Sequence, residues 1–374
     1  MPLTDYRTLG RSGLVVSPLA LGTMTFGTTR WGSSDATSRA VFDAFVDAGG
    51  NFLDTANVYA GGRSEALLGR FVADRSLRNH LVIATKAGFS TGTGPHTGGL
   101  SSSHLNASIH ASLTRLGMDH VDLFFAHAWD GVTPAHELLE TMAALVRSGK
   151  TRYWGISNAP AWYAAQVTTL ARSTGMPGPI VLQYFYSLVN RDIEDEHIPL
   201  ARDAGLGVMP WSPLAYGLLT GKYDRTTVES AAPRAAGLPR DAATATEARP
   251  ADDKRLDGAN PFGDSLFTPR NWAIVGEVQR VAAALEVSAA TVAMRWVTGR
   301  EGISSTLLGI SRVEQLDANL RALDLVLPEE HRAALDAVSA PAEARMLYGL
   351  FHGQVRRHAI FGGASVRAHD ERPR

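Results

Sequence analysis

The chain has 374 residues, of which 45% are hydrophobic, so it is long enough to bury a substantial core in one large domain or two smaller ones. Its formal net charge is −1 and its basic residues are scattered, which argues against nucleic acid or an anionic membrane as a partner. The chain contains no cysteine, which excludes a disulfide framework, a thiolate nucleophile and cysteine-based zinc sites.

The amino-terminal stretch MPLTDYRTLGRSG has no apolar signal-peptide core, and no later segment offers about 18 consecutive apolar residues. We therefore expect a cytoplasmic protein. The charge pattern favours a small-molecule ligand over nucleic acid or membrane. Whether the chain forms a homo-oligomer stays open.

The first predicted element is a β-hairpin formed by residues 6–9 and 14–16. After it, short apolar runs alternate with helix-like periodic segments as far as the mid-300s. Periodic segments include residues 35–48, 64–73, 103–116, 134–148, 160–172 and 270–285. The eight strand candidates begin at Leu19, Asn51, Leu81, Val121, Thr151, Ile180, Gly207 and Ser304. This alternation predicts an α/β fold, the (β/α)8 TIM barrel, as a single domain over residues 1–374 with a core of about 6–340; a doubly wound sheet is the alternative.

Two segments fall outside this pattern. Residues 224–268, which follow the seventh strand, are rich in alanine, proline, arginine and aspartate. A loop of this length is usually functional or disordered, so it either covers a bound ligand or is a disordered insertion. The carboxyl-terminal tail, about residues 341–374, is also weakly patterned. Its apolar residues Leu347, Tyr348, Phe351 and Phe361 are candidates for capping a ligand pocket.

Four polar residues lie at or just beyond the ends of three consecutive strand candidates: Asp54, Tyr59, Lys86 and His127. Each alone has an ordinary explanation, such as a helix cap for Asp54 or a structural ion pair for Lys86. In a parallel barrel, however, the carboxyl ends of the strands converge on one face, and the barrel interior is normally filled by branched apolar side chains. The joint placement therefore indicates an active site.

These residue types suit reduction of a carbonyl group, because the developing alkoxide must receive a proton as hydride arrives. Tyr59 would act as the general acid, although an ordinary tyrosine has a pKa of about 10. The ammonium of Lys86 would lower that pKa, and Asp54 would keep the ammonium charged and aimed. His127 would hydrogen-bond the substrate oxygen.

Several longer motifs accompany these residues. They are LGRSGLVVSPLALGTM, FLDTANVYAGGRSEALLGR, ATKAG, SLTRLGMDHVDLFFAH, GKTRYWGISN, MPWSPLAYGLLTGKY and LLGISRVEQLDANL. With these motifs in this order, the chain resembles the aldo-keto reductases from Leu9 to about Leu327. The resemblance implies that Asp54, Tyr59, Lys86 and His127 form the catalytic tetrad. It also implies NADP(H) as cofactor, bound extended across the barrel without a Rossmann fold.

The resemblance carries over a set of cofactor-binding residues. They are Gly22, Thr23, Met24, Asp54, Ser157, Asn158, Gln183, Trp211, Ser212, Pro213, Leu214, Gly217, Leu219, Gly221, Lys222, Gly309, Ser311, Arg312, Gln315 and Asn319. Trp211 would stack on the nicotinamide ring. Lys222 would face the pyrophosphate and Arg312 the 2′-phosphate. The chain departs from the family at Ala318, where members commonly carry glutamate beside the adenine-contacting asparagine.

The substrate is expected to contact Phe26, Trp31, Tyr59, His127 and Trp129. This aromatic set favours an aldehyde or ketone with a bulky apolar or ring-shaped part. No metal site is predicted, since neither HExxH nor an HxH after the first strand is present.

Three functional hypotheses remain. The leading one is a general NADPH-dependent carbonyl reductase. A narrower one is ketone or enone reduction on a nucleotide-activated deoxysugar or another secondary metabolite. The third is a cofactor-sensing regulatory subunit that resembles the potassium-channel β-subunits. A metal-dependent barrel hydrolase is disfavoured by the missing ligands.

Overall fold

The computed structural model describes residues 2–28, 32–231, 234, 254–257, 260 and 262–341. The chain divides into two compact units, Met1–Ser339 and Ala340–Arg374. Apart from residues 340 and 341, the second unit lies outside the described residues, and with it the four tail residues named above. Trp31 and most of residues 224–268 also lie outside them. The fold given below is that of the first unit.

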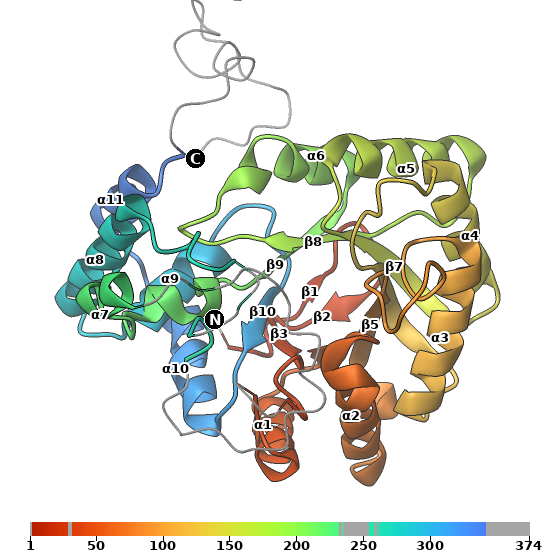
Figure 1. Cartoon of the computed structure of the whole chain (residues 1–374), viewed down its shortest axis with the longest axis horizontal. Coiled ribbons are helices and arrows are strands. Elements are labelled where there is room, and N and C mark those ends of the chain that lie inside the picture. The colour runs from red at the N-terminus through yellow and green to blue at the C-terminus, as the bar shows by residue number, and fades with distance from the viewer. Residues whose placement is uncertain are drawn as a thin grey trace, which may run out of the picture. The chain divides into compact units, whose positions relative to one another are not determined.

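Eight parallel strands form the centre of this unit (Figure 1). In sheet order they are β10 (Thr306–Gly309), β3 (Leu19–Gly22), β4 (Phe52–Asp54), β5 (Val82–Ala87), β6 (Val121–Ala126), β7 (Thr151–Ser157), β8 (Val181–Phe185) and β9 (Gly207–Trp211). The ring closes through a parallel bridge between Val208 and Ile303, where the Ser304 N–H donates to the Val208 carbonyl at 2.9 Å. The predicted (β/α)8 barrel is confirmed.

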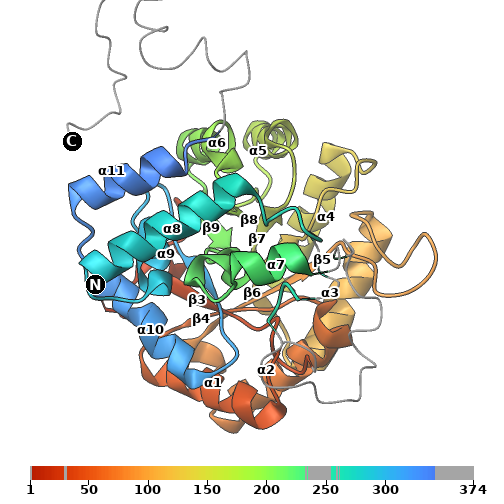
Figure 2. The same ribbon diagram turned by 60° about the vertical axis from the view of Figure 1, so that its left-hand side comes forward.

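Helices connect the strands and surround them, as Figure 2 shows. The α-helices are α1 (Asp35–Asp47), α2 (Arg63–Asp74), α3 (Ser102–Leu116), α4 (Ala135–Arg147), α5 (Ala161–Thr174), α6 (His197–Ala204), α7 (Arg225–Ser230), α8 (Pro269–Ala284), α9 (Ala289–Thr298), α10 (Val313–Asp324) and α11 (Glu329–Val338). The 3-10 helices are η1 (Tyr59–Gly62), η2 (Arg78–His80), η3 (Asp192–Glu194) and η4 (Ala215–Thr220). The periodic segments named above all form helices, with ends within two residues of those predicted.

Local sequence explains where these helices begin and end. The Ser101 hydroxyl accepts the His104 N–H at 3.3 Å at the start of α3, and Gly117 ends that helix in the left-handed conformation. The short helix α7 was not predicted, because it lies in the compositionally biased stretch after β9. Its start is set by Asp224, whose carboxylate accepts the Thr227 N–H at 2.7 Å. A single good cap is a weaker sequence signal than periodicity.

In the described part of the chain, no single helix is long and apolar enough to cross a membrane. Among the described helices, α8 and α9 meet that test of length and composition only when taken together, across a 102° bend.

The predicted amino-terminal hairpin is present as β1 (Arg7–Thr8) and β2 (Val15–Val16). Its residues Leu9 and Val16 belong to the apolar cluster inside the barrel. Gly10 lies so close to the start of β9 that a Cβ there would come within 2.5 Å of the Gly207 nitrogen. The hairpin therefore packs against the amino-terminal end of the barrel, and the opposite end is left for a ligand.

Side chains alternate along the strands between the barrel interior and the helix layer. The interior cluster contains Ala20, Phe52, Val82, Ala84, Leu123, Phe125, Val181, Met209 and Leu307. Their sequence neighbours, such as Leu53, Ile83 and Phe124, belong instead to the cluster that packs against the helices. We call the side chains that point into the barrel the inward row. The same two-residue period continues this row to the carboxyl ends of the strands, and we call that end of the barrel the catalytic face.

Candidate active site

The inward row ends in polar and aromatic residues at the catalytic face. They are Asp54 two residues after Phe52, Lys86 after Ala84, His127 after Phe125, Ser157 two positions after Gly155, Gln183 after Val181 and Trp211 after Met209. A period of two places all of them on the interior side of neighbouring strands. The structure thus brings together residues that are up to 157 positions apart, counted from Asp54 to Trp211 (211 − 54).

A buried ion pair forms the centre of this group. Lys86 Nζ donates to Asp54 Oδ1, and both side chains are fully buried. The same ammonium donates to the Thr55 carbonyl at 2.7 Å, and Gln183 Nε2 donates to the other Asp54 oxygen at 3.0 Å. Burial alone would lower the pKa of Lys86, but Asp54 and Tyr59 outweigh it, so this pKa lies above its usual value. The ammonium therefore keeps its charge.

Tyr59 lies beside this pair. Its hydroxyl accepts from Lys86 Nζ at 3.4 Å, and the ammonium is 5.0 Å from the centre of its ring. The next three residues, Ala60, Gly61 and Gly62, have φ values of 48°, 63° and 90°. This left-handed run turns the chain sharply between β4 and α2, and at Ala60 it carries the strain of a side chain in that region.

The pKa of Tyr59 is raised, which differs from the sequence-based expectation. Burial raises it most, Lys86 acts in the lowering direction, and Asp54 raises it again. The sequence predicts the effect of Lys86 but carries no measure of burial, which is the larger effect here. Tyr59 consequently holds its proton at neutral pH and is able to donate it.

His127 completes the group. Its ring centre lies 6.0 Å from that of Tyr59 and 4.5 Å from that of Phe89. Burial, with a smaller effect of Lys86, lowers the pKa of His127 well below its usual value, so the imidazole is neutral. Its Nδ1 atom is buried without a hydrogen-bond partner among the described residues. A buried polar atom of this kind marks a place where a ligand or water is expected.

Asn158 joins three of the predicted residues. Its amide Nδ2 donates at 2.9 Å both to the His127 carbonyl and to Ser157 Oγ, while its Oδ1 accepts from Trp211 Nε1 at 3.1 Å. One face of the Trp211 indole stacks on Phe185, with ring centres 4.9 Å apart and an angle of 16°. Phe185 was missed from the sequence, although it lies two residues after Gln183 in the same inward row.

Positive charge collects at one side of the catalytic face. We call Lys222, Lys254, Arg255 and Arg312 the cation group. The pKa of Lys222 is lowered, first by burial and then by Lys254, while Asp257 opposes and both Arg255 and Arg312 add to the lowering. Such a concentration of positive potential suits the phosphate groups of a dinucleotide.

The absence of a side chain at Gly217 allows the charged side chain of Lys222 to pass close to the backbone. The Lys222 side chain passes over Gly217, where an added Cβ would lie 2.6 Å from its Cε atom. Gly217 has a φ of 89° and follows Tyr216, which has a φ of 58°. These left-handed residues in η4 form the kind of concave backbone that accompanies anion sites.

Arg255 was not predicted and comes from the stretch after β9. Its Nη2 donates to Met24 Sδ at 3.3 Å, and its guanidinium lies 4.3 Å from the centre of the Tyr216 ring. Burial lowers the pKa of Arg255, while Tyr216, Tyr59 and Tyr223 act in the opposite direction. This part of residues 224–268 therefore reaches the catalytic face. The stretch has no periodicity, so no sequence signal pointed to Arg255.

The remaining cofactor candidates occupy three places, two of which flank the groups described above. Gly22 ends β3 and is followed by Thr23 and Met24, and the Thr23 N–H donates to the Asp54 carbonyl at 2.8 Å. Ser212, Pro213, Leu214, Gly217, Leu219 and Gly221 lie in and around η4, between Trp211 and Lys222. Each segment contacts the cation group, through Met24 and Arg255 in the first and through Gly217 and Lys222 in the second.

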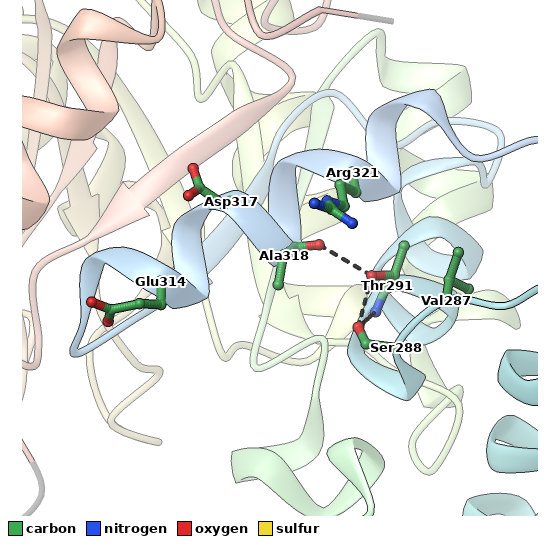
Figure 3. Close-up of a pocket in the computed structure, with 7 residues that line it drawn as sticks. All are labelled: Val287, Ser288, Thr291, Glu314, Asp317, Ala318 and Arg321. Atoms are coloured by element: carbon green, nitrogen blue, oxygen red, sulfur yellow. Dashed lines mark hydrogen bonds between the residues drawn. The ribbon is translucent and has the colours of Figure 1, made fainter.

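The third place is the one predicted for the adenosine end: Gly309 closes β10, and Arg312 occupies the exposed position just before α10. The Ser311 N–H donates to Gln315 Oε1 at 2.8 Å, and Asn319 is buried. Ala318 lines a hollow of about 210 Å³ between α9 and α10, opposite Ser288 and Thr291 (Figure 3). Its small side chain leaves part of this hollow open.

The structure places the predicted substrate residues in different parts of the fold. Phe26 is fully buried and its ring packs against Phe71 in the outer core, at 6.0 Å between ring centres, so we leave it out of the proposed substrate contacts. Its place in the outer core follows from the tertiary packing of the loop after β3, which has no periodic pattern. Trp129 is half-buried beside Asn158, and its backbone N–H donates to the backbone carbonyl of Asn158 at 3.2 Å. Trp31 lies outside the described residues.

Comparison with known proteins identifies the family of the chain. The model of the Aldo/keto reductase family matches residues 18–340. A probable voltage-gated potassium channel subunit beta from Oryza sativa subsp. japonica is 34% identical over 91% of this chain and 97% of its own length. An aryl-alcohol dehydrogenase from Pestalotiopsis microspora is 32% identical, over 88% and 80% of the two chains, and a norsolorinic acid reductase from Emericella nidulans is 33% identical, over 85% and 77%. The chain belongs to the aldo/keto reductase family, whose members are oxidoreductases that generally use nicotinamide cofactors.

Proposed function

We propose that the protein is an NADPH-dependent reductase that converts an aldehyde or ketone to an alcohol, with Tyr59 as the general acid. One observation carries this proposal: the protonated hydroxyl of Tyr59 lies 3.4 Å from the Lys86 ammonium and next to the neutral ring of His127. A carbonyl oxygen placed between Tyr59 and His127 would meet a proton donor and a hydrogen-bonding imidazole together. When bound, the reduced nicotinamide supplies the hydride.

The protein groups then have separate tasks. Tyr59 gives its proton to the substrate oxygen, and the Lys86 ammonium stabilises the phenolate that is left. Asp54, held from its other side by Gln183, keeps the ammonium charged and aimed. His127 holds the oxygen at the angle required for transfer, acting in its neutral form.

The residues present fit a phosphorylated dinucleotide. Trp211 is held in place by the Phe185 stack and the Asn158 bond, and so offers a rigid flat surface to the nicotinamide ring. The cation group would hold the phosphates. NADPH is proposed over NADH because Arg312 stands at the start of α10, where a helix terminus and a guanidinium favour the 2′-phosphate together. Ala318 offers no carboxylate to the adenine.

The proposed substrate is a small carbonyl compound with an aromatic or other apolar part. Trp129, two residues after His127 at the end of β6, supports this, and relatives are named for an aryl alcohol and for norsolorinic acid. The narrower alternative, reduction of a secondary metabolite, fits the second of these names.

The test is NADPH oxidation with a panel of aromatic and aliphatic aldehydes, ketones and dicarbonyls. The parent protein should turn over members of the panel, and Tyr59→Phe should lower kcat by about a hundredfold or more while it still binds NADPH. Tyr6→Phe removes the hydroxyl of an exposed tyrosine in the hairpin region and should be silent. Equal activity of Tyr59→Phe and the parent would exclude Tyr59 as the acid.

A second candidate is a cofactor-binding subunit that acts on a partner protein. The relative named as a probable potassium channel subunit beta, covered over 97% of its length, favours it. In that case NADPH binds with the expected affinity, but no carbonyl compound is reduced, and Tyr59→Phe changes nothing that can be measured on the isolated chain. Binding and turnover measured on one preparation separate the two candidates.

A further inference from the structure

Exposed apolar side chains gather beside the candidate active site. Among the described residues, the large apolar side chains most exposed to solvent are Tyr6, Val15, Phe89, Val132, Trp162 and Val326. Phe89 follows β5, Val132 follows β6, and Trp162 follows β7 as the second residue of α5. Since these strands are neighbours in the barrel, the segments that follow them lie side by side at the catalytic face. Three of these six side chains thus lie at the catalytic face, where the ring centre of Phe89 is 4.5 Å from that of His127.

Two tryptophans form the centre of this region, and we call Trp129 and Trp162 the tryptophan shelf. Their ring centres are 5.6 Å apart and their planes meet at 87°. Trp162 makes a second edge contact, at 5.7 Å, with Tyr163, yet it remains 59% exposed. With 59% of its surface exposed, Trp162 has flat indole surface available to another ring.

The shelf is rigid because the loop beneath it is tied at several points. The Asp130 carboxylate accepts from the backbone N–H groups of Val132, Thr133 and Leu100 at 3.0, 2.8 and 2.8 Å, and from Thr133 Oγ1 at 2.6 Å. The Tyr163 hydroxyl donates to the Thr133 carbonyl at 3.0 Å. Burial raises the pKa of Tyr163 to about 12, so it remains a donor.

The same bonds indicate what kind of ligand the shelf accepts. A sugar ring that stacks on tryptophan also needs polar groups at its edges for the hydroxyls. Asp130 is the acidic group in this loop, and its carboxylate is already used by four hydrogen bonds within the protein. Because the acidic group of this loop is already used, a flat surface made by two indole rings favours an aryl group over a glycosyl group.

The distance from His127 to the tryptophan shelf favours a ligand with more than one ring. Trp129 stands two residues after His127, a backbone span of at most about 7 Å. The ring centre of Trp162 lies a further 5.6 Å from that of Trp129. A ligand that contacts both tryptophans while its carbonyl is at His127 therefore needs more than one ring, and two or three fused rings have that length.

We propose that the tryptophan shelf is a second binding site for the distal rings of a polycyclic aryl aldehyde or ketone whose carbonyl lies between Tyr59 and His127. This rests on the proposed reductase function. Trp162 acts as a specificity residue: it contacts the part of the substrate that does not react, and so changes binding more than the chemical step.

The first test compares benzaldehyde, naphthaldehyde and anthraldehyde as substrates. Trp162→Ala should raise KM about fivefold to tenfold for the two fused-ring aldehydes, with kcat and the KM for benzaldehyde changed less than about twofold. Trp162→Phe should recover most of the loss. Val326→Ala, which alters a similarly exposed side chain between α10 and α11, is the control. An equal change for all three aldehydes, or none for the fused-ring pair, would overturn the proposal.

The second test does not depend on turnover and so separates failure of the shelf from failure of the proposed function. The indole N–H resonance of Trp162 is assigned by its loss in Trp162→Phe and is followed by NMR in the NADPH-bound protein. Naphthalenemethanol should shift it and methyl glucoside should not. If the glucoside alone shifts it, or neither compound does, the aryl assignment is wrong, even if benzaldehyde is reduced. If no aldehyde is reduced but naphthalenemethanol shifts it, the shelf stands and the reductase proposal fails.

Discussion

The hydroxyl of Thr85 donates a 2.6 Å hydrogen bond to the fully buried carboxylate of Glu65, and so ties α2 to the strand that carries Lys86. Arg115 of α3 donates to the other carboxylate oxygen, also at 2.6 Å. Because α2 begins directly after η1, these bonds hold in place the strained turn that presents Tyr59 to Lys86. Glu65 is therefore a positioning residue for the proposed acid.

Replacing Glu65 by alanine should leave the buried Thr85 hydroxyl and the Arg115 guanidinium without their acceptor. We expect the free energy of unfolding to fall by about 2 kcal/mol. The cost is not larger because Arg115 is partly exposed, so water replaces part of the hydrogen bonding that its guanidinium loses. Urea unfolding measures this. Glu137→Ala, which removes the exposed acceptor of the Ser102 N–H, should cost less than about 0.5 kcal/mol. Losses of equal size in the two variants would contradict the assignment.

Burial of His127 predicts a specific loss of stability in acid. Its pKa lies well below 6.5 in the folded protein, whereas unfolding returns it to its ordinary value. Below pH 6.5 the unfolded chain therefore binds a proton that the folded protein does not, and stability falls as the pH is lowered. This one group contributes a slope of at most about 1.4 kcal/mol per pH unit.

His127→Gln should accordingly make the decline of unfolding free energy below pH 6.5 shallower. Urea unfolding at several pH values on both sides of that point measures the slope. The matched control is His136→Gln, which changes an exposed histidine of α4. Identical slopes in the parent and in His127→Gln would show that His127 is not buried in its neutral form.

Arg312→Ala should change KM for NADPH and KM for NADH to different extents. If the guanidinium holds the 2′-phosphate, its loss raises KM for NADPH by about tenfold or more and leaves KM for NADH nearly unchanged. Lys222→Met is the comparison, because the pyrophosphate that Lys222 would face is common to both cofactors, so both KM values should rise together. Equal effects of Arg312→Ala on NADPH and NADH would remove the basis for the NADPH preference.

A charged network joins α11 to α9. Asp336 accepts from Trp296 Nε1 at 2.8 Å and pairs with Arg300 at 2.9 Å. Asp336→Ala should lower the free energy of unfolding by about 1–2 kcal/mol, a value reduced by the partial exposure of both charges. Calorimetry measures it, with Asp317→Ala on the exposed side of α10 as the control. A loss no larger than that of the control would show that the network contributes only screened surface charge.

The barrel and its polar end were accessible from the sequence because they follow a short-range pattern. Strands with a period of two separated by helices with their own period predict the topology, and the same period places Asp54, Lys86 and His127 on the inward row. Phe185 was available from that rule as well, two residues after Gln183. These features depend only on neighbours a few positions away along the chain.

Tertiary structure alone decided the features that depend on packing between distant segments. Phe26 and Trp129 are both aromatic residues in loops after strands, yet one lies in the core and the other beside the candidate site. Arg255 reaches Met24 from 231 positions away along the chain, out of a stretch with no pattern. The pKa of Tyr59 is raised because burial outweighs the ammonium beside it. Burial is a property of the surrounding fold, so the residue types predicted which groups interact, but only their packing decided which effect is larger.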